Sequence, residues 1–239
     1  MAAGSYQITR KITQKIEHGG ERLWRINDFQ GLPFTAVAQA LSRLARRGTI
    51  DRLSKGIYYC SRQTALGKSL PNPVALQALL PRHSKVFPSG IAAANLLGFS
   101  TQIPKQKEVA TSAPSLPRKL IGADTIIHTR RPEAWIGLSE TDAAVLDFLR
   151  RAGRTSELSP KETIKRTIAI LSEKGRFERL LKIADSEPPR MRAMLGALGE
   201  QMGKKPTLLK RLRNSLNPLS KFDFGLLAGL PYAHKWQAG

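Results

Sequence analysis

The pattern of apolar and polar residues is most regular between Pro33 and Tyr59. Its first part predicts a helix with one apolar face, because the apolar side chains recur at about 3.6 residues: Val37, Ala40, Leu41, Leu44 and Ala45. Pro33 suits the first turn of such a helix, since its missing N–H group would have no partner there. Gly48 follows the last turn, where a left-handed residue ends a helix at little cost. The pattern therefore predicts a helix between Pro33 and Gly48.

The residues after this helix predict a β-hairpin. Its strands would cover residues 49–53 and 57–59, joined by a turn that contains Lys55 and Gly56. A polar helix that runs directly into a basic hairpin is typical of the recognition helix and wing of a winged helix-turn-helix domain.

The segment before the long helix completes this order of elements. Ile8, Ile12 and Ile16 recur every fourth residue, which predicts a first helix over about residues 5–17. Residues 23–26 are apolar and predict a short strand. The side chains at 27–28 are suited to cap a short helix around residues 29–30.

The remaining chain predicts a second domain. Residues 60–73 are polar with two prolines and are interpreted as a linker, followed by short helices at 74–80 and 89–97. Extended pieces are predicted at 108–111, 120–121 and 125–129. We therefore expect a helix-rich α+β fold, with a winged helix-turn-helix domain at residues 1–70 and an α+β effector domain at residues 71–239.

The C-terminal part of that second domain is predicted to be helical. Ser139 and Asp142 fit a capping box that opens one helix, and Ser159 with Glu162 fits a second. A further helix is expected after Pro188. The last residues are too apolar to extend into solvent, so we expect them to pack back on the second domain.

Composition and charge indicate the kind of partner. The chain has 239 residues, a formal net charge of +21 and a pI near 10.8. Lys and Arg outnumber Asp and Glu by 8 in residues 1–70, by 3 in 71–150 and by 10 in 151–239. This excess favours a polyanionic partner, with nucleic acid before an acidic membrane surface. A spanning segment and a signal peptide are not predicted, and the single Cys60 excludes an internal disulfide, so we expect a cytoplasmic protein.

The predicted recognition helix and wing contain the candidate DNA contacts. These are Thr35, Gln39, Ser42, Arg43, Arg46, Arg47, Arg52 and Lys55. The N-terminal half of such a helix meets base edges in the major groove, which assigns base contacts to Thr35 and Gln39 first and to Arg43 next. Ser42, Arg46 and Arg47 are expected to contact phosphates, and Arg52 and Lys55 would bring the wing onto the neighbouring backbone or into the minor groove. The alternative is that the arginines only form a solvated helix face.

A second basic cluster lies late in the chain and consists of Lys204, Lys205, Lys210, Arg211 and Arg213. Two interpretations remain open for it. The cluster is either an auxiliary contact for DNA or an acidic partner, or it is an ordinary solvated helix face.

The wing sequence carries a resemblance to a known family. The segment LSRLARRGTIDRLSKGIYY, followed by Thr64, Gly67 and Pro71, resembles the N-terminal domain of AbiEi-like antitoxins of type IV toxin–antitoxin systems. SGIAAANLLGFSTQIP at 89–104 and KEVATSAPS at 107–115 resemble the start of the effector domain in that family. The resemblance implies an antitoxin that represses its own operon by binding inverted repeats in its promoter. It also implies opposition, direct or indirect, to a toxin resembling a nucleotidyltransferase.

The motifs do not favour catalysis by this chain. Gly67, Lys68 and Ser69 would need a glycine at position 62 to form a phosphate loop, and that residue is arginine. The four histidines lack metal-ligand spacing, and we expect no metal and no cofactor. Asp124, Glu140 and Asp142 lack the companion residues of a nuclease site. Two alternatives to a DNA-binding antitoxin stay open. The first is an RNA-binding basic protein, and the less favoured one is a DNA-processing enzyme.

Overall fold

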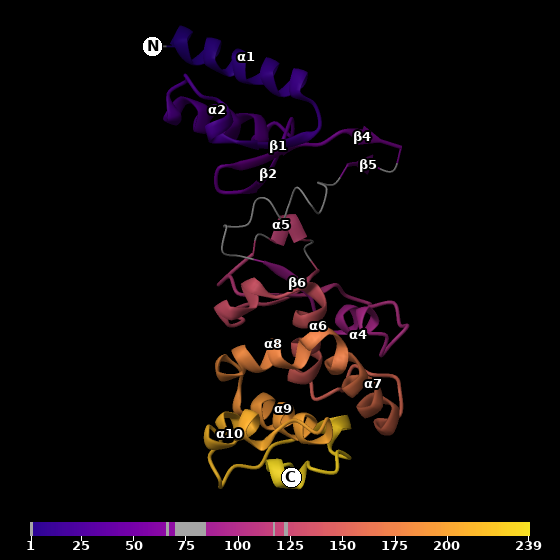
Figure 1. Ribbon diagram of the computed structural model, residues 1–239. Coiled ribbons are helices and arrows are strands. Elements are labelled where there is room, and N and C mark those ends of the chain that lie inside the picture. The colour runs from indigo at the N-terminus through magenta and orange to yellow at the C-terminus, as the bar shows by residue number, and fades with distance from the viewer. Residues whose placement is uncertain (1, 66, 70–84, 117, 122–123) are drawn as a thin grey trace. The chain divides into compact units, whose positions relative to one another are not determined.

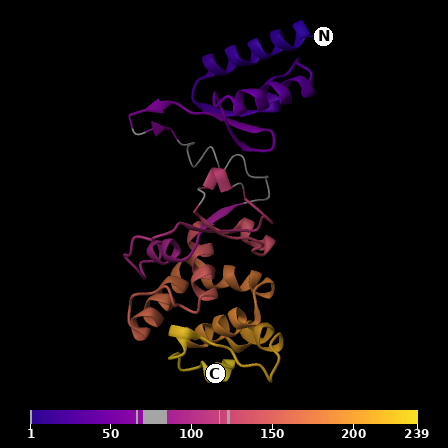
Figure 2. The same cartoon turned by 180° about the vertical axis from the view of Figure 1, so that it is seen from behind.

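The computed structural model describes residues 2–65, 67–69, 85–116, 118–121 and 124–239. These residues form two compact units, whose elements are labelled in Figure 1 and seen from behind in Figure 2. The first unit contains residues up to 69 together with the segment around helix α5. The second unit contains residues 85–114 and 124–239. The predicted boundary at residue 70 and the predicted helix at 74–80 lie outside the described residues.

The first unit has the order of elements expected for a winged helix. Its elements are α1 (Ala2–Gly19), β1 (Arg22–Arg25), the 3-10 helix η1 (Ile26–Asp28), α2 (Phe34–Arg46), β2 (Asp51–Ser54) and β3 (Ile57–Cys60). The strands form an antiparallel sheet in the order β1-β3-β2, with Trp24 and Arg52 both paired to Tyr58. The predicted long helix and hairpin are thus confirmed to within about two residues at each end.

Apolar side chains from α1, α2 and the sheet form the core of the first unit. Ile12 and Ile16 are fully buried and Ile8 packs beside them, which confirms the stripe predicted for the first helix. Val37 and Leu41 are buried on the facing side of α2. Burial of such side chains stabilises a fold by roughly 1.5–3 kcal/mol each.

One local prediction in the first unit, the position of its short helix, was wrong. The short helix lies at Ile26–Asp28 rather than around residues 29–30, because the Asp28 carboxylate accepts the Arg25 backbone N–H at 2.7 Å. Phe29 is instead buried against Trp24, with their ring centroids 5.5 Å apart.

The predicted linker also contains structure. Strands β4 (Gln63–Thr64) and β5 (Gly67–Lys68) pair antiparallel in a short hairpin. The Ser69 backbone N–H donates to the Arg62 carbonyl at 2.8 Å, which closes this hairpin. Residue 66 and residues 70–73 of the predicted linker lie outside the described part of the chain.

Helix α5 (Arg118–Ile121) replaces the extended piece predicted at residues 120–121. Ile121 packs with Leu53 and Tyr59 of the wing hairpin in a small apolar cluster. This contact groups α5 with the first unit, whereas the predicted division assigned it to the second domain.

The second unit combines a small sheet with a helical part. It contains β6 (Val86–Pro88), α4 (Ile91–Leu96), β7 (Glu108–Thr111), β8 (Ile126–His128), η2 (Glu133–Gly137), α6 (Glu140–Arg150), α7 (Pro160–Ser172), η3 (Glu173–Gly175), α8 (Arg176–Ile183), η4 (Ala184–Ser186), α9 (Pro189–Gln201), α10 (Pro206–Asn214), η5 (Gly225–Leu227) and η6 (His234–Trp236). Strand β7 pairs antiparallel with β6 and parallel with β8. The helix-rich α+β class is confirmed.

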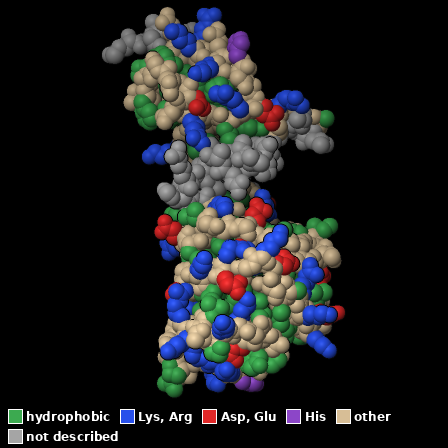
Figure 3. All heavy atoms as spheres, in the orientation of Figure 1, with side chains coloured by type: hydrophobic (Ala, Val, Ile, Leu, Met, Phe, Trp, Pro, Cys, Tyr) green, Lys and Arg blue, Asp and Glu red, His purple; other side chains and the backbone are tan. Residues whose placement is uncertain are grey.

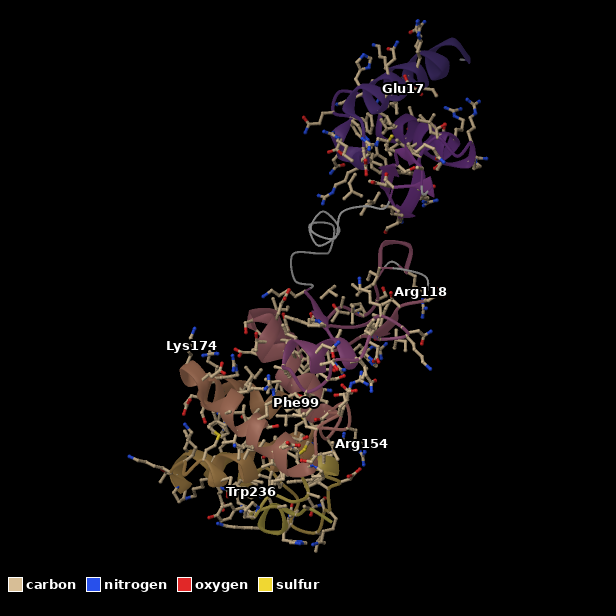
Figure 4. The ribbon with its side chains drawn as sticks, turned by 90° about the vertical axis from the view of Figure 1, so that its right-hand side faces the viewer. Glu17, Phe99, Arg118, Arg154, Lys174 and Trp236 are labelled. Carbon is tan, nitrogen blue, oxygen red and sulfur yellow. The ribbon has the colours of Figure 1, made fainter. Side chains whose placement is uncertain are left out.

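Aromatic rings fill the core of the second unit. Phe99 stacks on Phe148 of α6 with the centroids 4.0 Å apart. Figure 4 shows Phe99 and Trp236 among the helices, with Lys174 and Arg154 towards the outside. The end of the chain packs back on this core as predicted, since Trp236 is buried and residues 222 and 238 form a parallel bridge.

The helix caps match the sequence in one case and partly in the other. Ser159 and Glu162 form the complete capping box predicted for α7. Ser139 accepts the Asp142 N–H at 3.1 Å, as predicted for α6. The Asp142 carboxylate does not return to the cap, because it binds Arg176 and Arg179 of α8.

Among the described residues, no helix combines the length and apolarity that a bilayer crossing requires.

Candidate nucleic-acid interface

Helix α2 presents one polar stripe opposite its buried face. Thr35, Gln39, Ser42 and Arg46 follow the i, i+4, i+7, i+11 spacing that places side chains on one side of a helix. Thr35, Gln39 and Arg46 are exposed, and Ser42 is half-buried. The two leading candidates for base contact, Thr35 and Gln39, are therefore accessible to a ligand at the N-terminal half of this helix.

Two of the predicted DNA-contact residues make side-chain contacts within the first unit. The Arg43 guanidinium is half-buried and donates to the Thr9 hydroxyl of α1 at 3.2 Å. The Ser42 and Tyr58 hydroxyls lie 3.4 Å apart, which joins α2 to the sheet. Arg43 is thus turned towards α1, so its observed contact fixes the angle between the two helices.

The end of α2 directs the chain into the wing. Arg47 is the C-cap residue, and Gly48 has a φ of +76°, a left-handed conformation that costs glycine little. The next strand then follows, with Ile50 buried beneath it. This turn leaves the Arg46 and Arg47 side chains exposed just before the hairpin.

The wing carries two further exposed cations. Arg52 lies on β2 and Lys55 in the turn, both with exposed side chains. The register between β2 and β3 shifts between Arg52 and Ser54, and Gly56 closes the turn with a φ of +75°. A bulge of this kind twists a hairpin and changes the direction of its side chains.

A hydrogen-bond cluster fixes the base of the wing. The Tyr59 hydroxyl donates to the Glu21 carboxylate at 2.5 Å and lies 3.2 Å from the Ser69 hydroxyl. The hydrogen bond from Tyr59 lowers the pKa of Glu21. Burial and the same bond raise the pKa of Tyr59. These contacts anchor strand β3 both to the residue before β1 and to the residue after β5.

One exposed residue of the candidate interface was missed by the sequence reasoning. Phe34 begins α2 and its side chain is 65% exposed, although large apolar side chains are usually covered. The periodicity held no signal of this exposure, because Phe34, Val37 and Leu41 follow the i, i+3, i+7 spacing of one apolar face. An apolar side chain beside Thr35 could contact a thymine methyl group.

The late basic cluster is mostly engaged within the second unit. Lys204 binds Glu178 at 2.5 Å, Arg211 binds Asp185 at 3.2 Å, and Arg213 lies 4.0 Å from the Trp236 ring centroid. Lys205 and Lys210 are exposed. On the face drawn in Figure 3, the Lys and Arg side chains of the second unit are spread over the surface with acidic side chains between them. The cluster therefore does not form one continuous cationic face on α10.

The acidic residues considered for a nuclease site have separate environments. Asp124 and Glu140 are exposed, whereas Asp142 is buried between two arginines. His128 Nε2 lies 2.9 Å from a carboxylate oxygen of Glu108. Within the part of the chain that the structure describes, no group of three or more His, Cys, Asp or Glu residues could hold a metal ion.

Comparisons with known proteins identify a family. No curated protein matches the chain. A crystal structure of the RV2827C protein from Mycobacterium tuberculosis is similar over 98% of this chain and 90% of that chain, at 13% identity and a TM-score of 0.46. A model described as a family of unknown function, DUF6088, matches residues 7–175, which include helix α2, the hairpin of β2 and β3, and much of the second unit. The chain therefore belongs to the DUF6088 family.

Proposed function

We propose that this protein binds double-stranded DNA in a sequence-specific way through the first unit. The observation that carries the proposal is the exposed stripe of α2, with Thr35 and Gln39 open at its N-terminal half and Arg46 at its end. A helix of this kind fits the major groove, where each base pair presents a distinct set of donors and acceptors. The wing then adds exposed cations next to the same helix.

The residues of the interface divide by role. Gln39 can bond adenine in a bidentate way, so it specifies sequence together with Thr35. Arg46, Arg47 and the wing cations neutralise phosphates, which adds affinity without specifying sequence. Arg43 acts by holding α1 against α2 through Thr9.

The biological role that we propose is that of an antitoxin and autorepressor in the cytoplasm. It rests on the resemblance of residues 41–115 to AbiEi-like antitoxins, stated above. The first unit would bind inverted repeats in the promoter of its own operon. The second unit would counteract a toxin resembling a nucleotidyltransferase, by binding it or by an indirect route.

The first experiment is a footprint of the full chain on DNA upstream of its own gene, with random duplex as competitor. We expect protection of two half-sites about one helical turn apart. Binding no tighter than to random duplex would contradict the repressor role. Preference for structured RNA over both duplexes at equal salt would instead support the RNA-binding alternative.

The base-contact assignment has its own test in Gln39→Ala. We expect operator affinity to fall by about 1–3 kcal/mol while affinity for random duplex stays unchanged. Gln14→Ala is the matched control, because Gln14 is also an exposed helical glutamine but lies on α1. Equal losses on operator and random duplex would show that Gln39 does not read bases.

The antitoxin role is tested by co-expression with the gene next to its own. Growth arrest by that gene alone, relieved by this protein, is the expected result. Relief by a variant that cannot bind the operator would show that neutralisation belongs to the second unit. Absence of toxicity from the neighbouring gene would leave a DNA-binding regulator and contradict the antitoxin role.

A further inference from the structure

A cationic cavity lies within the second unit. Its volume is about 260 Å³, and its polar lining consists of His128, Arg131, Arg150, Arg151 and Arg190. The lining residues that the structure describes include no carboxylate. Four guanidinium groups around one small space are costly to bring together unless anions compensate their charge.

Buried carboxylates hold these arginines in place without lining the cavity. Asp147, whose side chain is fully buried, binds both Arg131 and Arg151 at 3.1 Å. Glu187, also fully buried, binds Arg150 at 2.8 Å and accepts the indole N–H of Trp135 at 2.7 Å. These anions fix the guanidinium orientations, so the remaining donors are preorganised for a ligand.

The third carboxylate completes the network at the sheet. Glu108 of β7 lies 2.6 Å from Arg151 and 2.9 Å from His128 Nε2. Three carboxylates thus contact three of the arginines and the histidine, while Arg190 donates to a backbone carbonyl, that of Arg150. Arg190 also lies near the exposed carboxylate of Asp223, whose pKa it helps to lower, and it stands beside the N-terminal end of α9, whose dipole is positive.

The electrostatics of Arg131 support an uncompensated positive charge. Burial and the neighbouring Arg150 cation lower the pKa of Arg131, and they outweigh the effect of Asp147. Arg131 and Arg150 both lie near the Trp135 ring, at 5.5 and 5.6 Å from its centroid. An anion in the cavity would offset the repulsion between these two guanidinium groups.

The backbone is unusual beside two of the lining arginines, Arg131 and Arg151. Arg130, which precedes Arg131, has a φ of +57°, and Ala152, which follows Arg151, has a φ of +53°. Non-glycine residues rarely adopt this conformation, and such positions concentrate at functional sites. Hydrogen bonds from the Arg130 and Arg131 N–H groups to Ala113 and Thr111 hold the first of these turns.

We propose that this cavity binds a small phosphate monoester, with the guanidinium groups donating to the phosphate oxygens. Arginine is suited to this role, because its planar fork can donate two parallel hydrogen bonds to one phosphate. The volume lies just below the usual range for drug-sized ligands, about 300–1,000 Å³, and therefore favours a phosphate group with at most a sugar. Pro188 and Met191 supply an apolar wall for that part. All of the lining residues belong to the second unit.

Calorimetric titration of the full chain, in phosphate-free buffer, tests the proposal. The probes are inorganic phosphate and ribose 5-phosphate, with unphosphorylated ribose and sodium chloride at equal ionic strength as controls. Saturable binding of one phosphorylated ligand per chain is expected. Equal affinity for the two phosphorylated probes identifies the phosphate group as the whole ligand, and tighter binding of the sugar phosphate shows that the apolar wall is used. Binding of ribose alone, or heat that follows only ionic strength, would overturn the proposal.

Arg190→Gln is the most informative variant, because the hydrogen bond of Arg190 within the protein goes to a backbone carbonyl and its neighbouring carboxylate, Asp223, is exposed. We expect about tenfold to hundredfold weaker binding, the effect of one charge-assisted hydrogen bond. Arg166→Gln is the matched control, since Arg166 is exposed, lies in the same unit and likewise donates to a backbone carbonyl, that of Leu97. Equal affinities of the wild type and Arg190→Gln would refute the site. If Arg190→Gln loses its far-ultraviolet circular dichroism, Arg190→Lys decides, with a smaller loss expected because lysine keeps the charge but not the fork.

Discussion

Gly196→Ala would test how the end of the chain is docked on α9. Gly196 lies in the middle of this helix, directly against the ring of Trp236, which is 1% exposed. A Cβ at position 196 would lie inside 3.0 Å of three ring carbons, a separation that real Cβ atoms essentially never show. The added methyl group can fit only if the buried ring or the helix moves.

The magnitude follows from two opposing effects. Alanine is favoured over glycine inside a helix by about 1 kcal/mol. Overpacking of a close-packed core usually costs about 1–3 kcal/mol, and displacement of a buried tryptophan lies at the upper end of that range. We therefore expect a net loss of about 1–2 kcal/mol in the free energy of unfolding, which corresponds to a Tm lower by about 2–8 °C.

The assay is urea unfolding followed by circular dichroism at 222 nm, with Gly137→Ala as the control. Gly137 has open space where its Cβ would be, so this variant should unfold like the wild type. In the Trp236→Leu background the ring is gone, and Gly196→Ala should then be neutral or stabilising. A Gly196→Ala protein as stable as the wild type, with Trp236 in place, would refute the packing described here.

Two further predictions concern charge. Arg47→Ala should weaken binding to all DNA sequences alike and reduce the slope of log affinity against log salt by about 1. The control Lys161→Ala, on α7, should leave the slope unchanged. A sequence-dependent loss from Arg47→Ala would contradict the phosphate role. Burial alone would raise the pKa of Asp142, but its bonds to Arg179 and Arg176 prevail and lower it. Stability from this group is therefore present above the unfolded pKa, about 3.9, and is lost as the pH falls through the lower folded value. Asp142→Asn should be less stable at pH 7 by about 3 kcal/mol and show a shallower loss below pH 4 in acid titrations of unfolding; unchanged pH dependence would show that the ion pairs carry no stability.

The elements that follow a strong local pattern could be predicted from the sequence. The face of α2, the isoleucine stripe of α1 and the capping box at Ser159 each depend on side chains within one or two turns. Such local signals survive in the fold because tertiary contacts reinforce them. The open position of Gln39 follows from the same periodicity.

The remaining features depend on contacts between distant parts of the chain. Strand β6 is only three residues long and pairs with β7 across a wide gap in sequence, so its own pattern does not reveal it. Leu120 and Ile121 are apolar enough for a strand, but their segment packs as a helix against the wing. The cationic cavity is likewise assembled from residues 128–191, where no motif joins them. Partners of Lys204 and Arg211 lie on α8 and η4, which only the folded chain brings near.

The position of Ile121 has a consequence for synthesis of the protein. The wing residues Leu53 and Tyr59 emerge from the ribosome roughly 3–12 s before Ile121, at about 5–20 residues per second. During that interval the wing hairpin of the first unit lacks part of its apolar cover. A nascent or prematurely terminated chain would therefore expose this cluster to aggregation and to chaperones. The apolar cluster of the first unit is complete only in chains that have been translated past α5, in the second half of the family match.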